Sequence, residues 1–304
     1  MRVLLIGGSG QLGLTIKSSI QNDNIEIISP NSQTLNLLDL DTIDKIFIET
    51  QPEIIINCAA YTDVDNAEIE SKKATLINVE GPKYLAKKAE EISSFIIQVS
   101  TDYVFGSDVS GPFSNLDKTA PVNCYGKTKS DAELAIKKNT NNFLVLRTAS
   151  LVSKYDGNFV SSIISGLLKE KNFKIIKNQI ISMTCTNYLA HGISSIINLN
   201  DKINLKSLSK NNIIHYTNYG YTDWYSIAEK IQKRLIFKGL LKDKNFIKPI
   251  LISDWKSLAI RPKDSRLLLD NEVFNFLKIK HKKWEDSLIE IIDDYLLLNG
   301  FIDD

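Results

Sequence analysis

The sequence has few cysteines and histidines, and their spacing argues against a metal centre or a disulfide framework. Cys58, Cys124 and Cys185 stand alone in a chain of 304 residues, and none has a partner at a metal-ligand spacing. The three histidines also lack the neighbours of a ligand set or of a catalytic nucleophile. We therefore expect no bound metal and free thiols, which favours a reducing compartment such as the cytoplasm.

Excess charge of one sign and long apolar runs are also missing. Lys+Arg 37 against Asp+Glu 36 leaves a formal net charge of +1, so no overall field attracts nucleic acid or an anionic membrane. No run approaches the roughly 20 apolar residues of a membrane helix. The segment Met1–Ile6 is too short for the apolar centre of a signal peptide. The sequence thus predicts neither nucleic acid nor a membrane as a partner.

The chain does contain short apolar runs that alternate with segments of helical periodicity. Predicted strands cover residues 2–6, 25–29, 54–58, 95–100 and 143–147, and predicted helices cover residues 12–20, 40–50, 74–91 and 125–138. Strands that alternate with helices form a parallel sheet with right-handed crossovers, covered on both faces. The predicted fold class is therefore α/β, a doubly wound parallel sheet of the Rossmann type.

A glycine-rich loop follows the first predicted strand and opens the first predicted helix. Gly7, Gly10 and Gly13 form Gly-x-x-Gly-x-x-Gly, a variant of the dinucleotide fingerprint. Such glycines permit a tight turn, a close approach of backbone to pyrophosphate, and close helix–strand packing. The N–H groups at the helix start are then available to phosphates. The pattern predicts a dinucleotide-binding domain over residues 1–149, which later strands can join.

The regular alternation of predicted strands and helices ends after about residue 150. Helical pieces at 159–169, 223–235 and 284–298 alternate there with short strands and loops. We expect residues 150–304 to form mainly a smaller α/β substrate region packed on the strand ends.

The second predicted strand ends at Ser29-Pro-Asn31, without an acidic residue that would bind a ribose 2′-hydroxyl. A 2′-phosphate would meet no repulsion there. The sequence favours NADPH as the cofactor, with NADH as the alternative.

A tyrosine and a lysine stand four residues apart in the stretch Tyr125-Gly-Lys-Thr-Lys129. On a helix this spacing puts both side chains on one face. A lysine ammonium in that position favours the phenolate and is expected to lower the pKa of Tyr125. With the glycine loop and with Ser100-Thr101-Asp102 at the end of an apolar run, the pair indicates hydride transfer.

These motifs and several further blocks resemble the extended short-chain dehydrogenases/reductases, and within them the dTDP-4-dehydrorhamnose reductase family. The blocks are Asn57-Cys-Ala-Ala-Tyr-Thr-Asp-Val-Asp65, Ser100-Thr-Asp-Tyr-Val-Phe105, Leu146-Arg-Thr148, Gly157-Asn-Phe-Val160, Gln179, His215-Tyr216, Trp224-Tyr225 and Arg261-Pro262. The similarity covers nearly the whole chain.

The resemblance implies a set of cofactor-binding residues and a set of catalytic and substrate-binding residues. Tyr125 would donate the proton, Lys129 would acidify it and hold the nicotinamide ribose, and Thr101 would hydrogen-bond the substrate carbonyl. The cofactor set comprises Gly7, Gly10, Gln11, Leu12, Gly13, Asn36, Leu37, Ala59, Ala60, Tyr61, Thr62, Tyr125 and Lys129. The substrate set comprises Thr101, Asp102, Tyr103, Ser150 and Arg261.

The chain departs from the family pattern where the substrate is expected. Ser150 and Val152 stand where the family has an aromatic residue and a tyrosine, and Asn178 stands where it has an aspartate. Loss of an aromatic surface removes on the order of 1 kcal/mol of ring-face contact. On this ground we expect weak turnover of dTDP-4-dehydrorhamnose and a better substrate among other 4-keto nucleotide sugars. Positions matching a magnesium cluster of some family members hold Thr15 and His191, which predicts no such metal.

The predicted function is NAD(P)H-dependent reduction of a 4-keto-6-deoxy nucleotide sugar, which makes that sugar the expected partner. Two alternatives remain: a nucleotide-sugar epimerase with bound NAD, and a non-catalytic regulatory subunit similar to the beta subunit of methionine adenosyltransferase. A homodimer is one assembly that the resemblance allows.

Overall fold

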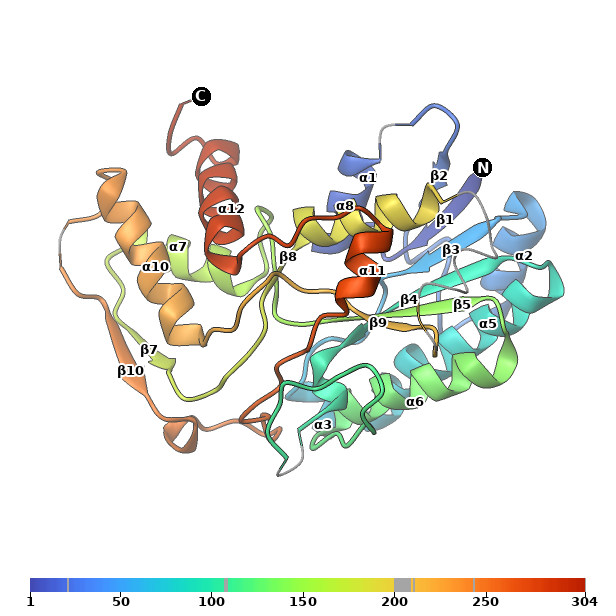
Figure 1. Cartoon of the computed structure of the whole chain (residues 1–304), viewed down its shortest axis with the longest axis horizontal. Helices are drawn as coiled ribbons and strands as arrows, with labels where there is room; N and C mark the ends of the chain where they lie inside the picture. Colours follow the sequence, from blue (N-terminus) through green and yellow to red (C-terminus); the bar gives the residue numbers. More distant parts are fainter. Residues whose placement is uncertain (21, 107–108, 200–208, 210, 243, 304) are drawn as a thin grey trace.

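The computed structural model describes residues 1–20, 22–106, 109–199, 209, 211–242 and 244–303. Its centre is a six-stranded, fully parallel sheet in the order β2-β1-β3-β4-β5-β9 (Figure 1). The strands are β1 (Arg2–Ile6), β2 (Glu26–Ile28), β3 (Ile54–Asn57), β4 (Phe95–Thr101), β5 (Phe143–Thr148) and β9 (Ile213–His215). The prediction of a doubly wound α/β fold is confirmed.

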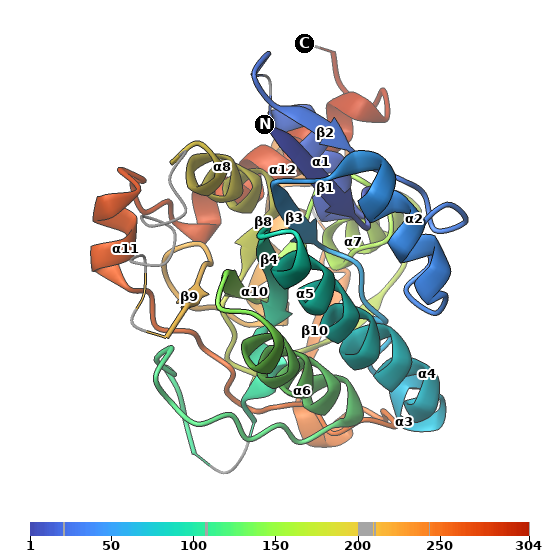
Figure 2. The same ribbon diagram turned by 90° about the vertical axis from the view of Figure 1, so that its right-hand side faces the viewer.

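Helices cover both faces of this sheet (Figures 1 and 2). Val3 and Leu5 of β1 pack with α1 and α8 on one face, while Leu4 and Ile6 pack with α2, α5 and α6 on the other. Strands buried on both faces explain the continuous apolar runs in the sequence. The helices are α1 (Gln11–Ser19), α8 (Thr186–Ile197), α2 (Leu40–Thr50), α5 (Gly81–Glu91) and α6 (Cys124–Asn139).

The helix predicted over residues 74–91 is interrupted. It begins as α4 (Ser71–Thr75), continues as a π-helical turn over Leu76–Glu80, and becomes α5 at Gly81. Pro82 has no backbone N–H and cannot donate the usual helical hydrogen bond to Asn78. The π-helical turn widens the helix at the point where this hydrogen bond is missing. Such turns often occur at functional sites.

A smaller group of elements lies beside the sheet (Figure 1). It contains α7 (Phe159–Leu168), α10 (Trp224–Phe237), α12 (Trp284–Leu298) and two strand pairs, β7 (Phe173–Ile176) with β10 (Ile247–Ile250) and β6 (Leu151–Val152) with β8 (Thr184–Cys185). Short helices α3 (Asn66–Ile69) and α11 (Asn271–Phe276) complete the described elements, with 3-10 turns at Asp102–Val104 and Ile252–Asp254.

The chain does not divide at residue 149 into two separate cores. Strand β9 and helix α8 come from the second half, yet β9 pairs with β5 and α8 packs on α1. One apolar cluster runs from the sheet face under α1 and α8 into α7, α10 and α12. Among the described residues, no helix has the length and apolar character needed to cross a bilayer.

Candidate active site

Two glycines shape the loop between β1 and α1. Gly7 has φ +81°, and a Cβ added to it would lie 2.6 Å from the Ala59 backbone nitrogen. A Cβ added to Gly13 would lie 2.3 Å from the Gly7 carbonyl oxygen. Glycine is therefore required at both positions by the approach of backbone to backbone. The loop lies at the carboxyl ends of β1 and β3, where the strand order reverses, as expected of a dinucleotide site.

Gly10 is different, because its α-carbon faces open space. An added Cβ would meet only the Gly7 carbonyl oxygen, at 3.4 Å. Gly10 is also the N-cap of α1, whose first turn has no acidic residue and no side-chain cap. An uncapped helix start beside open space suits a bound phosphate.

The glycine loop and the predicted catalytic residues line one cavity of about 810 Å³. Of the predicted cofactor residues, Gly7, Gly10, Gln11, Leu12, Gly13, Ala59, Ala60, Thr62, Tyr125 and Lys129 lie in its wall, and so do Thr101 and Ser150. The Oε1 atom of Gln11 is buried without a hydrogen-bond partner in the described part of the chain. This orphaned acceptor and the open space at Gly10 both fit a dinucleotide with hydroxyl and phosphate groups.

Asn36, Leu37 and Tyr61 lie outside the cavity wall. The Asn36 backbone N–H donates to Thr42 Oγ1 at 3.0 Å, and the Leu37 side chain is buried in the core. The Tyr61 hydroxyl donates to Glu70 Oε2 at 2.6 Å. Their assignment to the cofactor stays a prediction.

Asp102, Tyr103 and Arg261 also lie outside the wall of this cavity. Asp102 is buried and accepts hydrogen bonds from Thr101 Oγ1 (3.0 Å) and Ser265 Oγ (2.5 Å). Burial raises the pKa of Asp102 to about 6, against the effect of these hydrogen bonds. Arg261 pairs with Asp65 through an Nη2–Oδ2 contact of 2.7 Å. Their roles toward substrate stay predictions.

Helix α6 brings Tyr125 and Lys129 to the cavity, as their spacing predicts. Asn123 caps its first turn by accepting from the Gly126 N–H at 2.8 Å, and donates to the Ile260 carbonyl oxygen at 2.8 Å. A Cβ added to Gly126 would lie 2.1 Å from the Tyr103 carbonyl oxygen. The absence of a side chain at Gly126 therefore lets α6 approach the turn that follows Thr101.

Thr101 ends strand β4 with its hydroxyl at the base of that turn. Its Oγ1 donates to Asp102 Oδ1 and accepts from the Tyr103 N–H at 3.2 Å. The hydroxyl thus caps the turn and also lies in the cavity wall beside Tyr125.

Lys129 is hydrogen-bonded in a way that the spacing alone did not predict. Its Nζ donates to the Val99 carbonyl oxygen at 2.7 Å, and burial lowers the pKa of Lys129 to about 8. Burial raises the pKa of Tyr125 well above its usual value, against a hydrogen bond with Thr101. The prediction that Lys129 lowers the pKa of Tyr125 is therefore wrong for this structure. Desolvation outweighs any effect of the ammonium.

Sequence reasoning missed the residue that supports the β3 loop. Asn78, in the π-helical turn, is buried, and its amide accepts from the Tyr61 N–H (2.7 Å) and donates to Thr128 Oγ1 (3.0 Å). It therefore links the loop after β3 to helix α6. The only sequence signal was Pro82 four residues later, which disturbs the regular helix.

The departures from the family pattern fall in three different environments. Ser150 lines the cavity and has φ +44°, whereas Val152 is fully buried in the core. Asn178 is exposed, and its side chain accepts from the Ile252 N–H at 2.7 Å. Val152 therefore does not lie where the substrate is expected, because β6 pairs with β8 and this side chain packs in the core.

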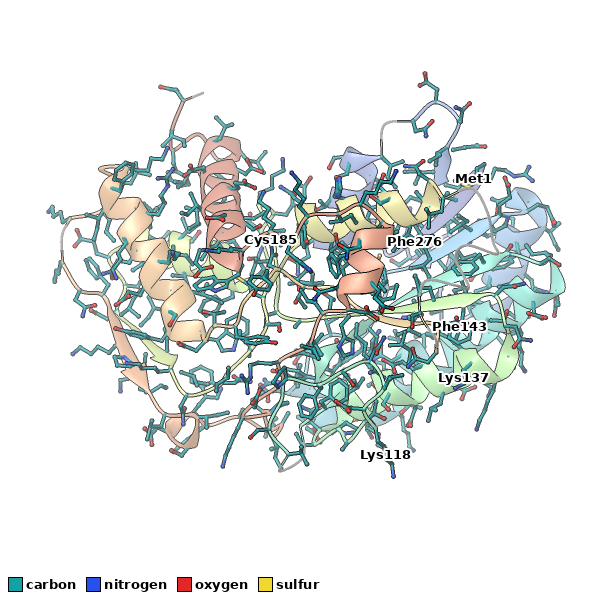
Figure 3. The ribbon with its side chains drawn as sticks, viewed as in Figure 1. Met1, Lys118, Lys137, Phe143, Cys185 and Phe276 are labelled. Atoms are coloured by element: carbon teal, nitrogen blue, oxygen red, sulfur yellow. The ribbon has the colours of Figure 1, made fainter. Side chains whose placement is uncertain are left out.

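The positions discussed for a metal do not form a cluster of ligands. Thr15 is buried and its hydroxyl bonds to Gln11 O (2.8 Å) and Thr186 Oγ1 (3.0 Å), joining α1 to α8. His191 is exposed. No group of three or more metal-ligating side chains occurs in the part of the chain that the structure describes. Cys58, Cys124 and Cys185 are free thiols, and Cys185 is buried at the start of α8 (Figure 3).

Comparison with known proteins gives one consistent result. A family described as RmlD substrate binding domain matches residues 1–297. A dTDP-4-dehydrorhamnose reductase of Aggregatibacter actinomycetemcomitans is 31% identical over 291 residues, which are 95% of this chain and 98% of that protein. A crystal structure of a dTDP-4-dehydrorhamnose reductase from Clostridium acetobutylicum has a TM-score of 0.83 and 32% identity, covering 96% of this chain and 99% of that one. A crystal structure of the Bacillus anthracis dTDP-4-dehydrorhamnose reductase in complex with NADP has a TM-score of 0.84 and 26% identity, with the same coverage. The chain belongs to the dTDP-4-dehydrorhamnose reductase family of extended short-chain dehydrogenases/reductases.

Proposed function

We propose that this protein is an NADPH-dependent reductase of a 4-keto-6-deoxy nucleotide sugar. The observation that carries the proposal is that Thr101, Tyr125 and Lys129 line the same cavity as the glycine loop. A proton donor, a hydroxyl and an ammonium beside a dinucleotide site are the groups that ketone reduction requires.

The cavity residues fit NADPH, which when bound supplies the hydride. Gly10 and the start of α1 would hold its diphosphate, and the Gln11 side chain has a free acceptor nearby. Ser29-Pro-Asn31 presents no carboxylate to repel a 2′-phosphate. The NADP-bound relative from Bacillus anthracis supports the same choice, with NADH as the second candidate.

The protein's own groups would handle the proton and the charge on oxygen. Tyr125 is protonated at neutral pH even at the ordinary tyrosine pKa of about 10, and burial raises that pKa further, so it remains a donor until the ketone oxygen becomes basic. The Thr101 hydroxyl would donate a second hydrogen bond to that oxygen once its single proton turns away from Asp102 Oδ1. Lys129, whose Nζ donates to the Val99 carbonyl oxygen, would hold the nicotinamide ribose.

We assign recognition of the sugar to residues around Thr101, Tyr125 and Lys129. We propose that Ser150 contacts the sugar, with Asp102 and Tyr103 supporting the turn that carries Thr101. Arg261 has a planar guanidinium that suits a diphosphate, but its pairing with Asp65 must then be shared or exchanged.

The assay is NADPH oxidation with a panel of 4-keto nucleotide sugars that includes dTDP-4-dehydrorhamnose. Stoichiometric loss of NADPH is expected for at least one sugar. Sugar conversion without net loss of NADPH would instead favour the epimerase, and no conversion of any sugar would favour the regulatory subunit. Preference for another sugar would implicate Ser150, since Val152 does not reach the wall.

Assembly and location follow from the same proposal. We propose a homodimer, from the resemblance to family members, and light scattering of the purified protein tests it. NADPH and nucleotide sugars are cytoplasmic metabolites, so we propose the cytoplasm as the place of action. We also propose that residues 150–304 contribute mainly to substrate binding, apart from α8 and β9.

A further inference from the structure

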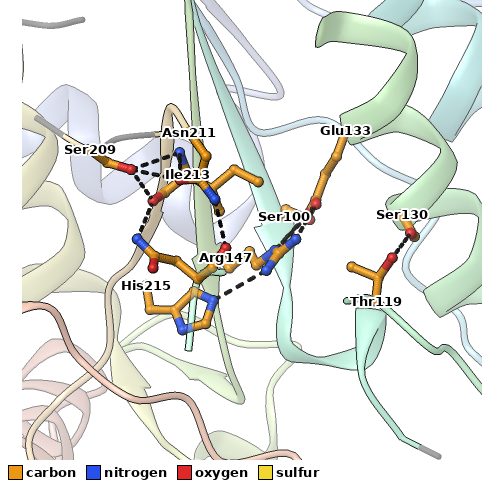
Figure 4. A network of polar contacts seen from close by, with 10 residues as sticks. Ser100, Thr119, Ser130, Glu133, Arg147, Ser209, Asn211, Ile213 and His215 are labelled. Carbon is orange, nitrogen blue, oxygen red and sulfur yellow. Dashed lines mark hydrogen bonds and ion pairs between the residues drawn. The ribbon is translucent and has the colours of Figure 1, made fainter. Parts of the chain in front are cut away.

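A chain of buried polar side chains joins helix α6 to strands β4, β5 and β9 (Figure 4). Glu133 accepts from Ser100 Oγ at 2.5 Å and from Arg147 through Nε (3.0 Å) and Nη2 (2.6 Å). Arg147 Nη1 contacts His215 Nε2 at 3.4 Å. All four residues are at most 6% exposed. None of them has a role in the mechanism given above.

The charges in this chain are balanced. Glu133 and Arg147 form a two-pronged ion pair, and Arg147 also lies over the ring of Phe105 at 5.0 Å. Burial and the neighbouring guanidinium lower the pKa of His215 to about 3, so this imidazole is neutral. Its Nδ1 then donates to the Leu268 carbonyl oxygen (3.2 Å), and its Nε2 accepts from Arg147.

A balanced buried ion pair contributes little net stability, but it fixes geometry. Glu133 is on α6, four residues after Lys129 and eight after Tyr125, and so projects from the same side of the helix. Ser100 immediately precedes Thr101 on β4. The Ser100–Glu133 hydrogen bond therefore joins the strand that carries Thr101 to the helix that carries Tyr125 and Lys129.

We propose that Glu133 is a positioning residue, which Arg147 holds in place and which sets, through Ser100, the separation of Thr101 and Tyr125. The inference rests on the proposed reductase function. An error of about 1 Å in such a separation can cost on the order of 100-fold in rate. The Ser100–Glu133 link would therefore affect the chemical step more than the binding of cofactor.

Helix α6 offers a matched control for this link. Ser130 is on the same helix, is 6% exposed, and donates to Thr119 Oγ1 at 2.9 Å, apart from β4 (Figure 4). Ser100→Ala and Ser130→Ala each remove one buried hydroxyl and one hydrogen bond. Only Ser100→Ala removes a hydrogen bond between β4 and α6, and it leaves the second one, from Lys129 Nζ to the Val99 carbonyl oxygen, in place.

The experiment compares the two variants with wild type, using NADPH and the best sugar of the panel. For Ser100→Ala we expect kcat to fall about 10- to 100-fold, with the NADPH Kd unchanged and a larger isotope effect on kcat with 4-deuterated NADPH. Ser130→Ala should match wild type in kcat, in the NADPH Kd and in the isotope effect. Equal kcat for the two variants would overturn the inference while leaving the reductase function intact. Absence of wild-type turnover would overturn both.

A second variant tests whether Ser100 acts through Glu133. Glu133→Gln keeps the size of the side chain and an acceptor for Ser100, but loses the ion pair with Arg147. If the two residues act through one link, the double variant should lose less than the product of the single losses in kcat. Independent, multiplicative losses would contradict the positioning role.

Discussion

Burial determines how the central side chains of the site hold their protons. Tyr125 and Lys129 both lie in a desolvated wall, which favours the neutral form of each. Both residues lie on α6 and in the cavity wall, as their spacing predicts. It could not reveal that Lys129 bonds to the Val99 carbonyl, because that contact depends on how α6 packs on β4.

Tyr125→Phe should keep NADPH affinity and lower kcat by at least about 100-fold, the usual contribution of a positioned acid. The ring and its packing against Tyr103 remain, while the transferable proton is lost. Steady-state kinetics with calorimetric titration of NADPH measures both quantities. Turnover close to wild type would end the assignment of Tyr125 as donor.

The pH dependence of activity should have a basic limb set by Lys129. With a folded-state pKa of about 8, its ammonium is lost as pH rises through that value, and kcat/KM for NADPH should fall. The unfolded chain keeps this proton up to about pH 10.4. Between these values the unfolded state binds more protons, so the contribution of Lys129 to the unfolding free energy rises with pH. A value of kcat/KM for NADPH that stays constant up to about pH 9.5 would contradict this role of Lys129.

Gly10→Val should abolish NADPH binding and leave the melting temperature close to wild type. Its added carbons would enter open space rather than protein atoms, unlike those on Gly13. Gly13→Ala is the contrasting variant, because its Cβ meets backbone and should lower stability. Calorimetric titration and thermal unfolding of both proteins separate the two effects. Unchanged affinity in Gly10→Val would show that the loop is only a tight turn.

At the scale of elements, local periodicity predicted most of the structure. Strand β1 and helices α2 and α12 match their predicted bounds, because apolar spacing alone determines which residues they bury. The π-helical turn before α5 was not predicted, since it depends on the contacts of Asn78 with Tyr61 and Thr128. Val152 was misplaced for a similar reason. Its neighbours in β8 are more than thirty residues away in the sequence.

The contact between α6 and the turn after β4 provides a test at this scale. Gly126→Ala would place a methyl group 2.1 Å from the Tyr103 carbonyl oxygen, so the helix must move away from Thr101. We expect a loss of kcat of at least about tenfold, together with a lower melting temperature. Ser130→Ala lies one turn later on α6 and should leave kcat unchanged. A fully active Gly126→Ala would show that this close approach is unnecessary.

Across the whole molecule, the sequence indicated a sheet-forming half and a less regular half but not how they interleave. The final strand of the sheet, β9, has only three residues, too few to carry a periodic signal. Its place beside β5 is a property of the complete tertiary structure.

A fragment of residues 1–149 should therefore fail to fold independently. It would lack β9 at the edge of β5 and α8 over the apolar face of α1. We expect aggregation and a denaturation profile without a cooperative transition. Circular dichroism during urea titration measures this, and a sharp transition with native-like helix content would show that the first half is an autonomous domain.

The late return of β9 also bears on biosynthesis. Strands β1 to β5 leave the ribosome well before Ile213, so the outer edge of β5 has unpaired N–H and C=O groups while the intervening chain is translated. Slow codons between Thr148 and Ile213 would prolong that vulnerable interval. Synonymous recoding of this one stretch is thus a route to altering soluble yield without changing any residue.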